Sequence, residues 1–338
     1  MLVRFWGVRG SLPSPPTNAD IRAKITQAIT IAQESFLAGE KLSVEELINK
    51  LPPHVPGFVG GHTPCLEISQ GDRVLIFDAG TGIRELGSFL YPRLTSGTDS
   101  ETLPSPKTLD LFFTHTHWDH IQGFPFFAPI YDPNVTLNIY ALDIDEVEKN
   151  LKIQQSTPHL FPMNFDNLSA KINFHKLTKA PLELAPFSID FISLPHPGGS
   201  TAYKVKGQDQ SVIFATDYEL LDDCPTAVQE REQLCAFIQN ATIFISDSQY
   251  TYLESHSKEG WGHSNALNVV NMAQLAGVKD LYLFHHDPNY NDEKLFSNLE
   301  KANIYNELLF AKSQMGIHLA IEGLSLELPQ PTKTRDKK

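Results

Sequence analysis

The stretch Thr114–Gly123, "THTHWDHIQG", places three histidines and an aspartate within six positions, from His115 to His120. It directly follows the apolar run "TLDLFF" (108–113), which predicts a buried strand. In an extended segment, residues two apart face the same side, so the rings of His115 and His117 can reach one cation. Asp119 and His120 follow where we expect a helix to begin, and they can bind a second cation. Imidazole and carboxylate together suit zinc, manganese or iron.

The same pattern of a strand that ends in a metal-binding residue type recurs in the second half of the chain. The runs "FSIDFISLPH", "SVIFATD", "TIFISD" and "DLYLFHH" predict strands that end at His196, Asp217, Asp247 and the pair His285 and His286. In α/β architectures, ligands gather beyond the ends of strands, where a rigid scaffold holds the loops. A solvated, histidine-rich loop is the alternative interpretation of 114–123, but it gives no reason for the motif to follow a buried strand.

The composition is that of an ordinary globular protein, and its charge limits the kinds of partner that it can bind. The chain has 338 residues, 41% of them hydrophobic, and a formal net charge of −13. Such an acidic chain is a poor candidate for non-specific binding to nucleic acid or to an anionic membrane, because both need Lys and Arg. Cys65, Cys224 and Cys235 are too few and too irregularly spaced for a disulfide framework. With no signal-peptide pattern and no apolar run of membrane-spanning length, we expect a cytoplasmic protein.

We expect a single domain over residues 1–328 with a helical insertion at 13–56 and a disordered tail at 329–338. Proline-rich breaks bound the insertion. Apolar residues at helical spacing predict a helix over 19–40, and a second helix over 43–51 begins with the spacing of a capping box. The insertion could cover the active site, form a dimer contact or be a surface elaboration.

The order of these motifs resembles that of the metallo-β-lactamase superfamily across nearly the whole chain. The family pattern is an Asp after an early strand, then H-x-H-x-D-H, a His, an Asp and a late His. The matching positions are Asp78 in "IFDAG", His115–His120, His196 in "LPHPGG", Asp217 in "FATD" and His285 in "LFHHDP". The resemblance implies an α/β protein with an αββα sandwich, two mixed β-sheets flanked by helices, and a pair of divalent metal ions.

The resemblance also implies a role for each residue. One ion would be held by His115, His117 and His196, the other by Asp119, His120 and His285, with Asp217 between the two. His286 competes with His285, which we favour because "HHDPNY" resembles an H-x-x-P-x-Y motif in which the first His is the ligand. Asp78 would accept a hydrogen bond from a ligand histidine. The ions, zinc or manganese with iron as a further candidate, would generate a bridging hydroxide, positioned by Asp119, as nucleophile.

Two further stretches resemble the phosphodiesterase branch of this superfamily, which includes the tRNA 3′-processing endonucleases. "GWGHS" contains His263 and "FISDSQY" contains Asp247. In that branch a carboxylate orients a histidine that contacts the scissile phosphate. We therefore expect His263 to act as general acid or phosphate clamp with Asp247 as its partner. A purely structural Asp–His pair is the alternative.

The N-terminal stretches "RFWGVRGSLPSP", "GGHTPC" and "FDAGTGIRELG" resemble a bacterial group of cyclic-nucleotide or cyclic-phosphate phosphodiesterases. His62 stands where that group usually has Asn, and it could reach the metal site or lie on the surface. Five residues near the motifs could contact the substrate or serve the structure: Arg9, Ser11, Ser200, Thr201 and Tyr203.

We therefore expect a dinuclear metal phosphodiesterase that acts on a small phosphodiester, a cyclic nucleotide or cyclic dinucleotide. A tRNA 3′-end endonuclease is the first alternative, but the chain has no Lys/Arg-rich arm to hold a tRNA. The others are a lactone or thioester hydrolase and a catalytically silent nucleotide-binding regulator. We expect a homodimer, with no stable nucleic-acid complex and no membrane partner.

Overall fold

The fold is described from a computed structural model, which covers residues 1–95, 107–156, 159–220 and 225–329. Within these ranges, no helix combines the length and the apolar character needed to cross a bilayer. The tail expected at 329–338 lies outside the described residues except for its first position.

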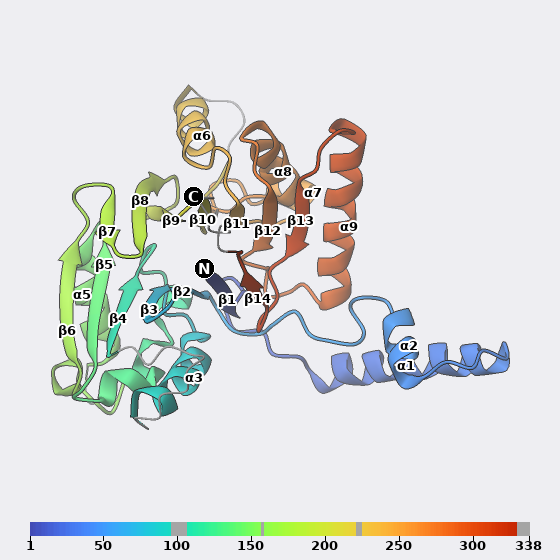
Figure 1. The fold of residues 1–338 in the computed structure, drawn as a ribbon, viewed down its shortest axis with the longest axis horizontal. Coiled ribbons are helices and arrows are strands. Elements are labelled where there is room, and N and C mark those ends of the chain that lie inside the picture. The colour runs from blue at the N-terminus through green and yellow to red at the C-terminus, as the bar shows by residue number, and fades with distance from the viewer. Residues whose placement is uncertain (96–106, 157–158, 221–224, 330–338) are drawn as a thin grey trace, which may run out of the picture.

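Two seven-stranded mixed sheets form the body of the protein (Figure 1). The first sheet has the order β14-β1-β2-β3-β4-β5-β6, in which β3 to β6 are parallel and the others pair antiparallel. Its strands are β1 Leu2–Gly7, β2 Cys65–Gln70, β3 Arg73–Phe77, β4 Thr108–Phe112, β5 Thr136–Ala141, β6 Lys171–Lys176 and β14 Ser325–Glu327.

The second sheet has the order β13-β12-β11-β10-β9-β8-β7, in which β10 to β13 are parallel. Its strands are β7 Leu182–Leu184, β8 Phe187–Leu194, β9 Ser200–Gly207, β10 Gln210–Ala215, β11 Ile243–Asp247, β12 Asp280–Phe284 and β13 Gly316–Leu319. The expected sandwich of two mixed sheets flanked by helices is therefore confirmed.

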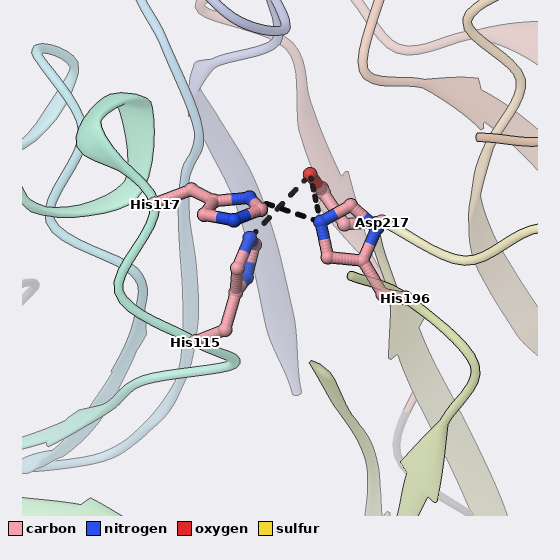
Figure 2. A group of neighbouring side chains, drawn as sticks. All are labelled: His115, His117, His196 and Asp217. Carbon is pink, nitrogen blue, oxygen red and sulfur yellow. Dashed lines mark hydrogen bonds and ion pairs between the residues drawn. The ribbon is translucent and has the colours of Figure 1, made fainter. Parts of the chain in front are cut away.

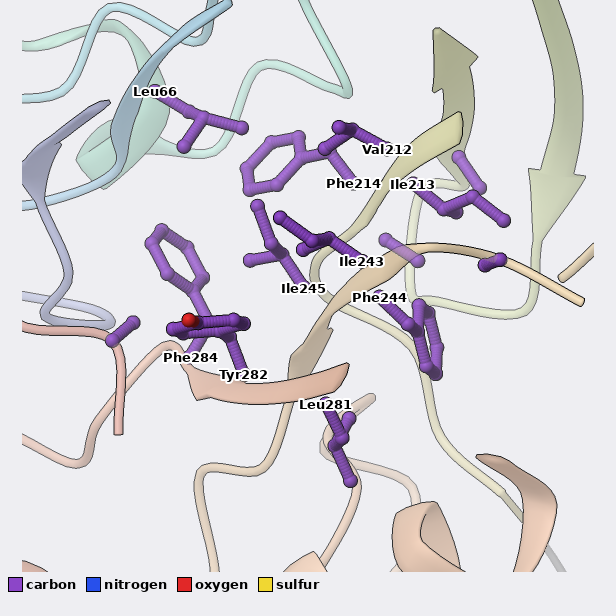
Figure 3. Packing of buried hydrophobic residues seen from close by; sticks show 14 of the residues in the cluster. Leu66, Val212, Ile213, Phe214, Ile243, Phe244, Ile245, Leu281, Tyr282 and Phe284 are labelled. Carbon is purple, nitrogen blue, oxygen red and sulfur yellow. The ribbon is translucent and has the colours of Figure 1, made fainter. Parts of the chain in front are cut away.

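The main hydrophobic core lies between the two sheets (Figure 3). Phe77 of β3 packs with Phe214 of β10 at 6.0 Å between ring centroids, and Phe112 of β4 packs edge-on with Tyr203 of β9 at 5.4 Å. Alternate residues of β3 point the other way, so Ile76 belongs to a second core on the outer face of the first sheet. A strand buried on both faces reads as a continuous apolar run, which is why β3, β4, β10 and β12 were predictable.

Helices cover the outer faces of both sheets (Figure 1). They are α3 Ile83–Thr95, α5 Ile144–Gln154, α6 Pro225–Phe237, α8 Ala266–Leu275 and α9 Asp292–Leu309, with single turns at α4 Trp118–Ile121 and α7 Tyr252–Ser255. The segment 92–107 is rich in Pro, Ser and Thr, which predicts a loop. That prediction is wrong at its start, because Pro92 lies in the last turn of α3 and the helix continues past it. The rest of that loop, 96–106, lies outside the described residues.

The segment 13–56 forms the two expected helices, α1 Asn18–Leu37 and α2 Val44–Lys50. Capping boxes start both, with Thr17 and Ser43 at the N-caps. In Figure 1 this helical pair projects from the body as an arm. At its base, the Lys24 ammonium contacts the Asp292 carboxylate at 2.6 Å, which ties the arm to the start of α9. Its role and the division of the chain into one domain with an insertion stay predictions.

Candidate metal centre

The site lies beyond the strand ends, where the two sheets meet. The segment after β4 supplies the H-x-H-x-D-H motif from the first sheet, and α4 begins within it at Trp118. The second sheet supplies His196 after β8, Asp217 after β10 and His285 after β12. Because β10, β11 and β12 are parallel neighbours, their carboxyl ends bring residues far apart in sequence to one edge.

The first group of converging side chains comprises His115, His117, His196 and Asp217 (Figure 2). The Nε2 atom of His196 lies 3.0 Å from Nδ1 of His117. Oδ2 of Asp217 lies 3.6 Å from Nε2 of His115 and 3.9 Å from Nε2 of His196. Three ring nitrogens and a carboxylate oxygen that face one another across such gaps form the donor set of a zinc-type ion.

The second group comprises Asp119, His120, His285 and again Asp217, all buried. Here Asp217 presents its other oxygen: Oδ1 lies 3.2 Å from Nε2 of His120 and 3.2 Å from Nε2 of His285. Oδ2 of Asp119 lies 3.3 Å and 3.2 Å from the same two nitrogens. One carboxylate therefore faces both groups, which is the geometry required of a bridging ligand.

Acceptors around the cluster fix the orientation of its histidines. The partners of the Nδ1 atoms are Asp78 for His120 (2.8 Å), the Gly262 carbonyl for His196 (2.8 Å), Gln249 Oε1 for His285 (3.1 Å) and Thr114 Oγ1 for His115 (3.0 Å). With the proton held on Nδ1, each Nε2 presents its lone pair to the cluster. Among the described residues, the buried Nε2 atoms of His115 and His120 have no hydrogen-bond partner, so these residues fit a pair of cations.

The charges of the cluster also suit cation binding. Burial lowers the pKa of His196 to about 4 despite the nearby Asp217 carboxylate, and it holds the pKa of His115 well below the ordinary value. Burial opposes ionisation of Asp119 and Asp217, but the neighbouring histidines, His120 and His285 among them, hold both carboxyl pKa values well below the usual range. The carboxylates of Asp217, Asp119 and Asp78 in turn outweigh burial and raise the pKa of His120 well above the ordinary value, so this group holds a proton that a bound cation would displace.

The backbone at the strand ends adopts left-handed conformations that are uncommon outside glycine. Asp78, Asp217 and His285 have φ values of 62°, 57° and 60°, and Ser11 has 62°. The Ser11 amide then donates to Oδ2 of Asp119 at 2.7 Å. Such residues concentrate where the surrounding structure enforces a functional geometry. The sharp turns aim side chains from the ends of the strands back into the centre.

His263 and Asp247 lie beside the cluster as a hydrogen-bonded pair. Nδ1 of His263 is 2.7 Å from Oδ2 of Asp247 and 4.0 Å from Oδ2 of Asp217. Burial would lower the pKa of His263, but the Asp247 carboxylate outweighs it and raises that pKa to about 9. Backbone amides of Gln249 and Ser264 hold the other oxygen of Asp247. The expected pairing is present, and the role of His263 stays a prediction.

Other sequence-based candidates lie outside the cluster. His286 is buried and its Nε2 contacts the Ala320 carbonyl at 2.9 Å, so His285, not His286, faces Asp217. The ring of His62 lies beside Thr81 and Glu322 and joins none of the groups found among the described residues.

Most of the proposed substrate contacts are instead structural. The buried Arg9 guanidinium donates to three backbone carbonyls, and Ser200 and Tyr203 each donate to one. Thr201 is buried in β9. Only Ser11 reaches the cluster, through its backbone amide. The supporting residues Thr114, Gln249 and Gly262 were not predicted, because a polar side chain or carbonyl that orients a ligand has no spacing signature of its own.

Comparisons with known proteins agree with the fold. The profile of the Beta-lactamase superfamily domain matches residues 73–286. A ribonuclease Z from Picrophilus torridus is 21% identical over 299 residues, covering 76% of this chain and 90% of that protein. The metallo-beta-lactamase fold protein YhfI from Bacillus subtilis superposes with a TM-score of 0.59 at 18% identity, covering 96% of this chain and 99% of that one. Unliganded yeast PDE1 gives a TM-score of 0.62 at 14% identity, covering 97% and 99%. The profile match, together with the two sheets and the order of the His/Asp motifs, means that this chain belongs to the beta-lactamase superfamily and has the metallo-β-lactamase fold.

Proposed function

We propose that this hydrolase cleaves a small phosphodiester, a cyclic nucleotide or a cyclic dinucleotide, with two divalent ions in its His/Asp cluster. The observation that carries the proposal is the pair of His263 and Asp247, hydrogen-bonded at 2.7 Å and placed beside the shared Asp217. A charged imidazolium next to two cation sites suits a phosphodiester, whose non-bridging oxygens and leaving group both carry or develop negative charge.

The ions, when bound, would supply Lewis-acid activation of water and neutralise charge on the phosphoryl oxygens. They would be held by His115, His117 and His196 on one side and by Asp119, His120 and His285 on the other, with Asp217 between them. Zinc or manganese suits these nitrogen and oxygen donors, and iron is a further candidate.

Two further contacts orient the carboxylate and the histidine that would take part in proton transfer. Ser11 donates its amide hydrogen to Oδ2 of Asp119 and so orients that carboxylate, which can accept a hydrogen bond from the attacking water. The Asp247 carboxylate accepts from Nδ1 of His263 and stabilises the doubly protonated ring, whose Nε2–H can then clamp a phosphoryl oxygen or donate its proton to the leaving oxygen. His263→Gln should therefore lower kcat while the protein still binds its ions.

A tRNA 3′-end endonuclease is the second candidate, and the similarity to ribonuclease Z favours it. The net charge of −13 favours a small substrate instead, since contacts to the backbone phosphates dominate affinity for a whole tRNA. Homodimerisation is likewise a proposal, which sedimentation equilibrium would test.

The test is a substrate panel on purified protein, stripped of metal and reloaded separately with zinc, manganese or iron. The panel contains cyclic mononucleotides, cyclic dinucleotides, short oligonucleotides, a precursor tRNA, a lactone and a thioester. Turnover of cyclic substrates with indifference to precursor tRNA supports the proposal. Preferred cleavage of precursor tRNA, or of the lactone or thioester, would replace it. Tight nucleotide binding without product under any metal would instead identify a silent regulator.

A further inference from the structure

Two of the three tryptophans lie, in the chain, directly next to a residue of the first group of ligands or to its hydrogen-bond partner. In the first group of ligands His117 is exposed, whereas every residue of the second group is buried. Trp118 directly follows His117, and Trp261 directly precedes Gly262, whose carbonyl oxygen lies 2.8 Å from Nδ1 of His196. The backbone of each tryptophan therefore adjoins the more exposed side of the cluster.

Both indoles are open to solvent. Trp118 is 56% exposed and Trp261 is 58% exposed. The third, Trp6, is packed instead: its ring lies 5.2 Å from that of Phe89, and its Nε1 donates to Glu67 at 3.0 Å. Exposed aromatic side chains on segments that adjoin a polar site are candidates for ligand contacts.

The segment that carries Trp261 is held in place. The Glu219 carboxylate accepts hydrogen bonds from the amides of Gly260 (2.9 Å) and Gly262 (2.9 Å), on either side of the tryptophan. The Trp261 amide donates to the carbonyl of Lys258 at 3.0 Å. An aromatic platform fixed in this way loses little entropy when a flat ligand stacks on it.

The Lys258 ammonium lies over the rings of Trp261 and Tyr250. Nζ of Lys258 lies 4.0 Å from the ring centroid of Trp261 and 5.4 Å from that of Tyr250. The Tyr250 ring in turn lies 5.9 Å from the ring of His263. Lys258 and the Trp261 ring are therefore connected, through Tyr250, to His263, the histidine that we assign to the scissile phosphate.

We propose that Trp118 and Trp261 form a base-binding subsite, which selects phosphodiesters that carry a purine or pyrimidine, with Lys258 as its anion-facing group. The choice of a phosphodiester as substrate rests on the proposed function, whereas the binding of a base to the two indoles does not. Stacking of one base on an aromatic side chain contributes about 1–3 kcal/mol, which is roughly a 5- to 150-fold effect on binding. Any base offers a π-face, so this subsite would distinguish nucleotides from sugar phosphates and not one base from another.

Tryptophan fluorescence tests the subsite without any turnover. Metal-loaded protein is titrated with adenosine 5′-monophosphate and, separately, with ribose 5-phosphate, which has the same sugar phosphate and no base. We expect saturable quenching by the nucleotide only. Trp118→Ala and Trp261→Ala should each weaken that binding 5-fold or more, and Trp6→Phe should leave it unchanged. Equal quenching by ribose 5-phosphate, or full nucleotide affinity in both alanine variants, would overturn the proposal.

Kinetics separate this inference from the proposed function. The selectivity is the ratio of kcat/KM for adenosine 2′,3′-cyclic phosphate to that for glycerol 1,2-cyclic phosphate. We expect Trp261→Ala to lower this ratio 5-fold or more. If the Trp261→Ala variant hydrolyses both substrates with an unchanged ratio, the proposed function stands and the proposed subsite is wrong. If the parent protein hydrolyses neither substrate but shows base-dependent quenching, the proposed subsite stands and the proposed function is wrong.

Discussion

Asp78→Asn is the sharpest test of how the second metal position is built. The buried Asp78 carboxylate accepts from the Thr114 amide at 2.8 Å, from the Thr114 hydroxyl at 2.9 Å and from Nδ1 of His120 at 2.8 Å. Asparagine tolerates the left-handed backbone at this position, where φ is 62°, so the turn is kept and only the charge and one acceptor are lost. An asparagine amide that faces His120 donates to Nδ1 and forces the ring proton onto Nε2, which removes its lone pair from the cluster.

The expected loss is large because no solvent replaces the missing acceptor. Partners that orient metal ligands contribute about 10- to 100-fold in metal affinity, and full burial of both Asp78 and His120 favours the upper end, about 2.7 kcal/mol. Competition with a chromophoric chelator measures this affinity for each ion. Asp110→Asn is the matched control, since Asp110 is equally buried but pairs with Arg73 and Asn138. If the Asp78→Asn protein holds both ions as tightly as the parent, Asp78 does not set the tautomer of His120.

Three further predictions follow from the same geometry. His263→Gln should lower kcat by about 100-fold or more, with metal content unchanged by elemental analysis, because removal of a general acid costs about 10²- to 10⁴-fold; loss of metal instead would make His263 a ligand. Gly10→Ala should weaken one of the two ions selectively in a chelator titration, because a Cβ there would lie 2.5 Å from the His285 ring, whereas Gly57→Ala, where a Cβ meets nothing within 4 Å, should have no effect. Saturation with zinc at 100 times its Kd should stabilise the fold by about 2.7 kcal/mol, and a Tm that does not respond to a chelator would contradict a structural link between ions and fold.

The part of the site that lies in short local motifs was predictable from the sequence. His115, His117, Asp119 and His120 occupy one segment after an apolar run, and strand ends supplied the other residues. The family resemblance, not the spacing, divided them into two groups around a shared aspartate. That division is consistent with the geometry of Asp217, whose two oxygens face different groups.

The rest of the fold depended on tertiary context that a single sequence does not carry. Helix α9 was not predicted, because its apolar residues are interrupted by polar ones and only Leu295 and Ala302 among its apolar residues are buried. Strands β6, β7, β13 and β14 lie at or near sheet edges, where exposed polar residues weaken the alternation that marks a strand. Strand β9 was not predicted either, because Ser200, Thr201, Lys204 and Lys206 interrupt its few apolar residues although most of the strand is buried.

The placement of the ligands on both sheets has a mechanical consequence. Asp119 follows β4 of the first sheet and His285 follows β12 of the second, 166 positions later. An ion between them would act as a reversible cross-link that closes a very long loop. A covalent link of that span restricts the unfolded chain by about 5 kcal/mol in the chain-entropy treatment. The ions would thus hold the two sheets together beside the core that they share, and removal of metal is expected to weaken the whole sandwich at once.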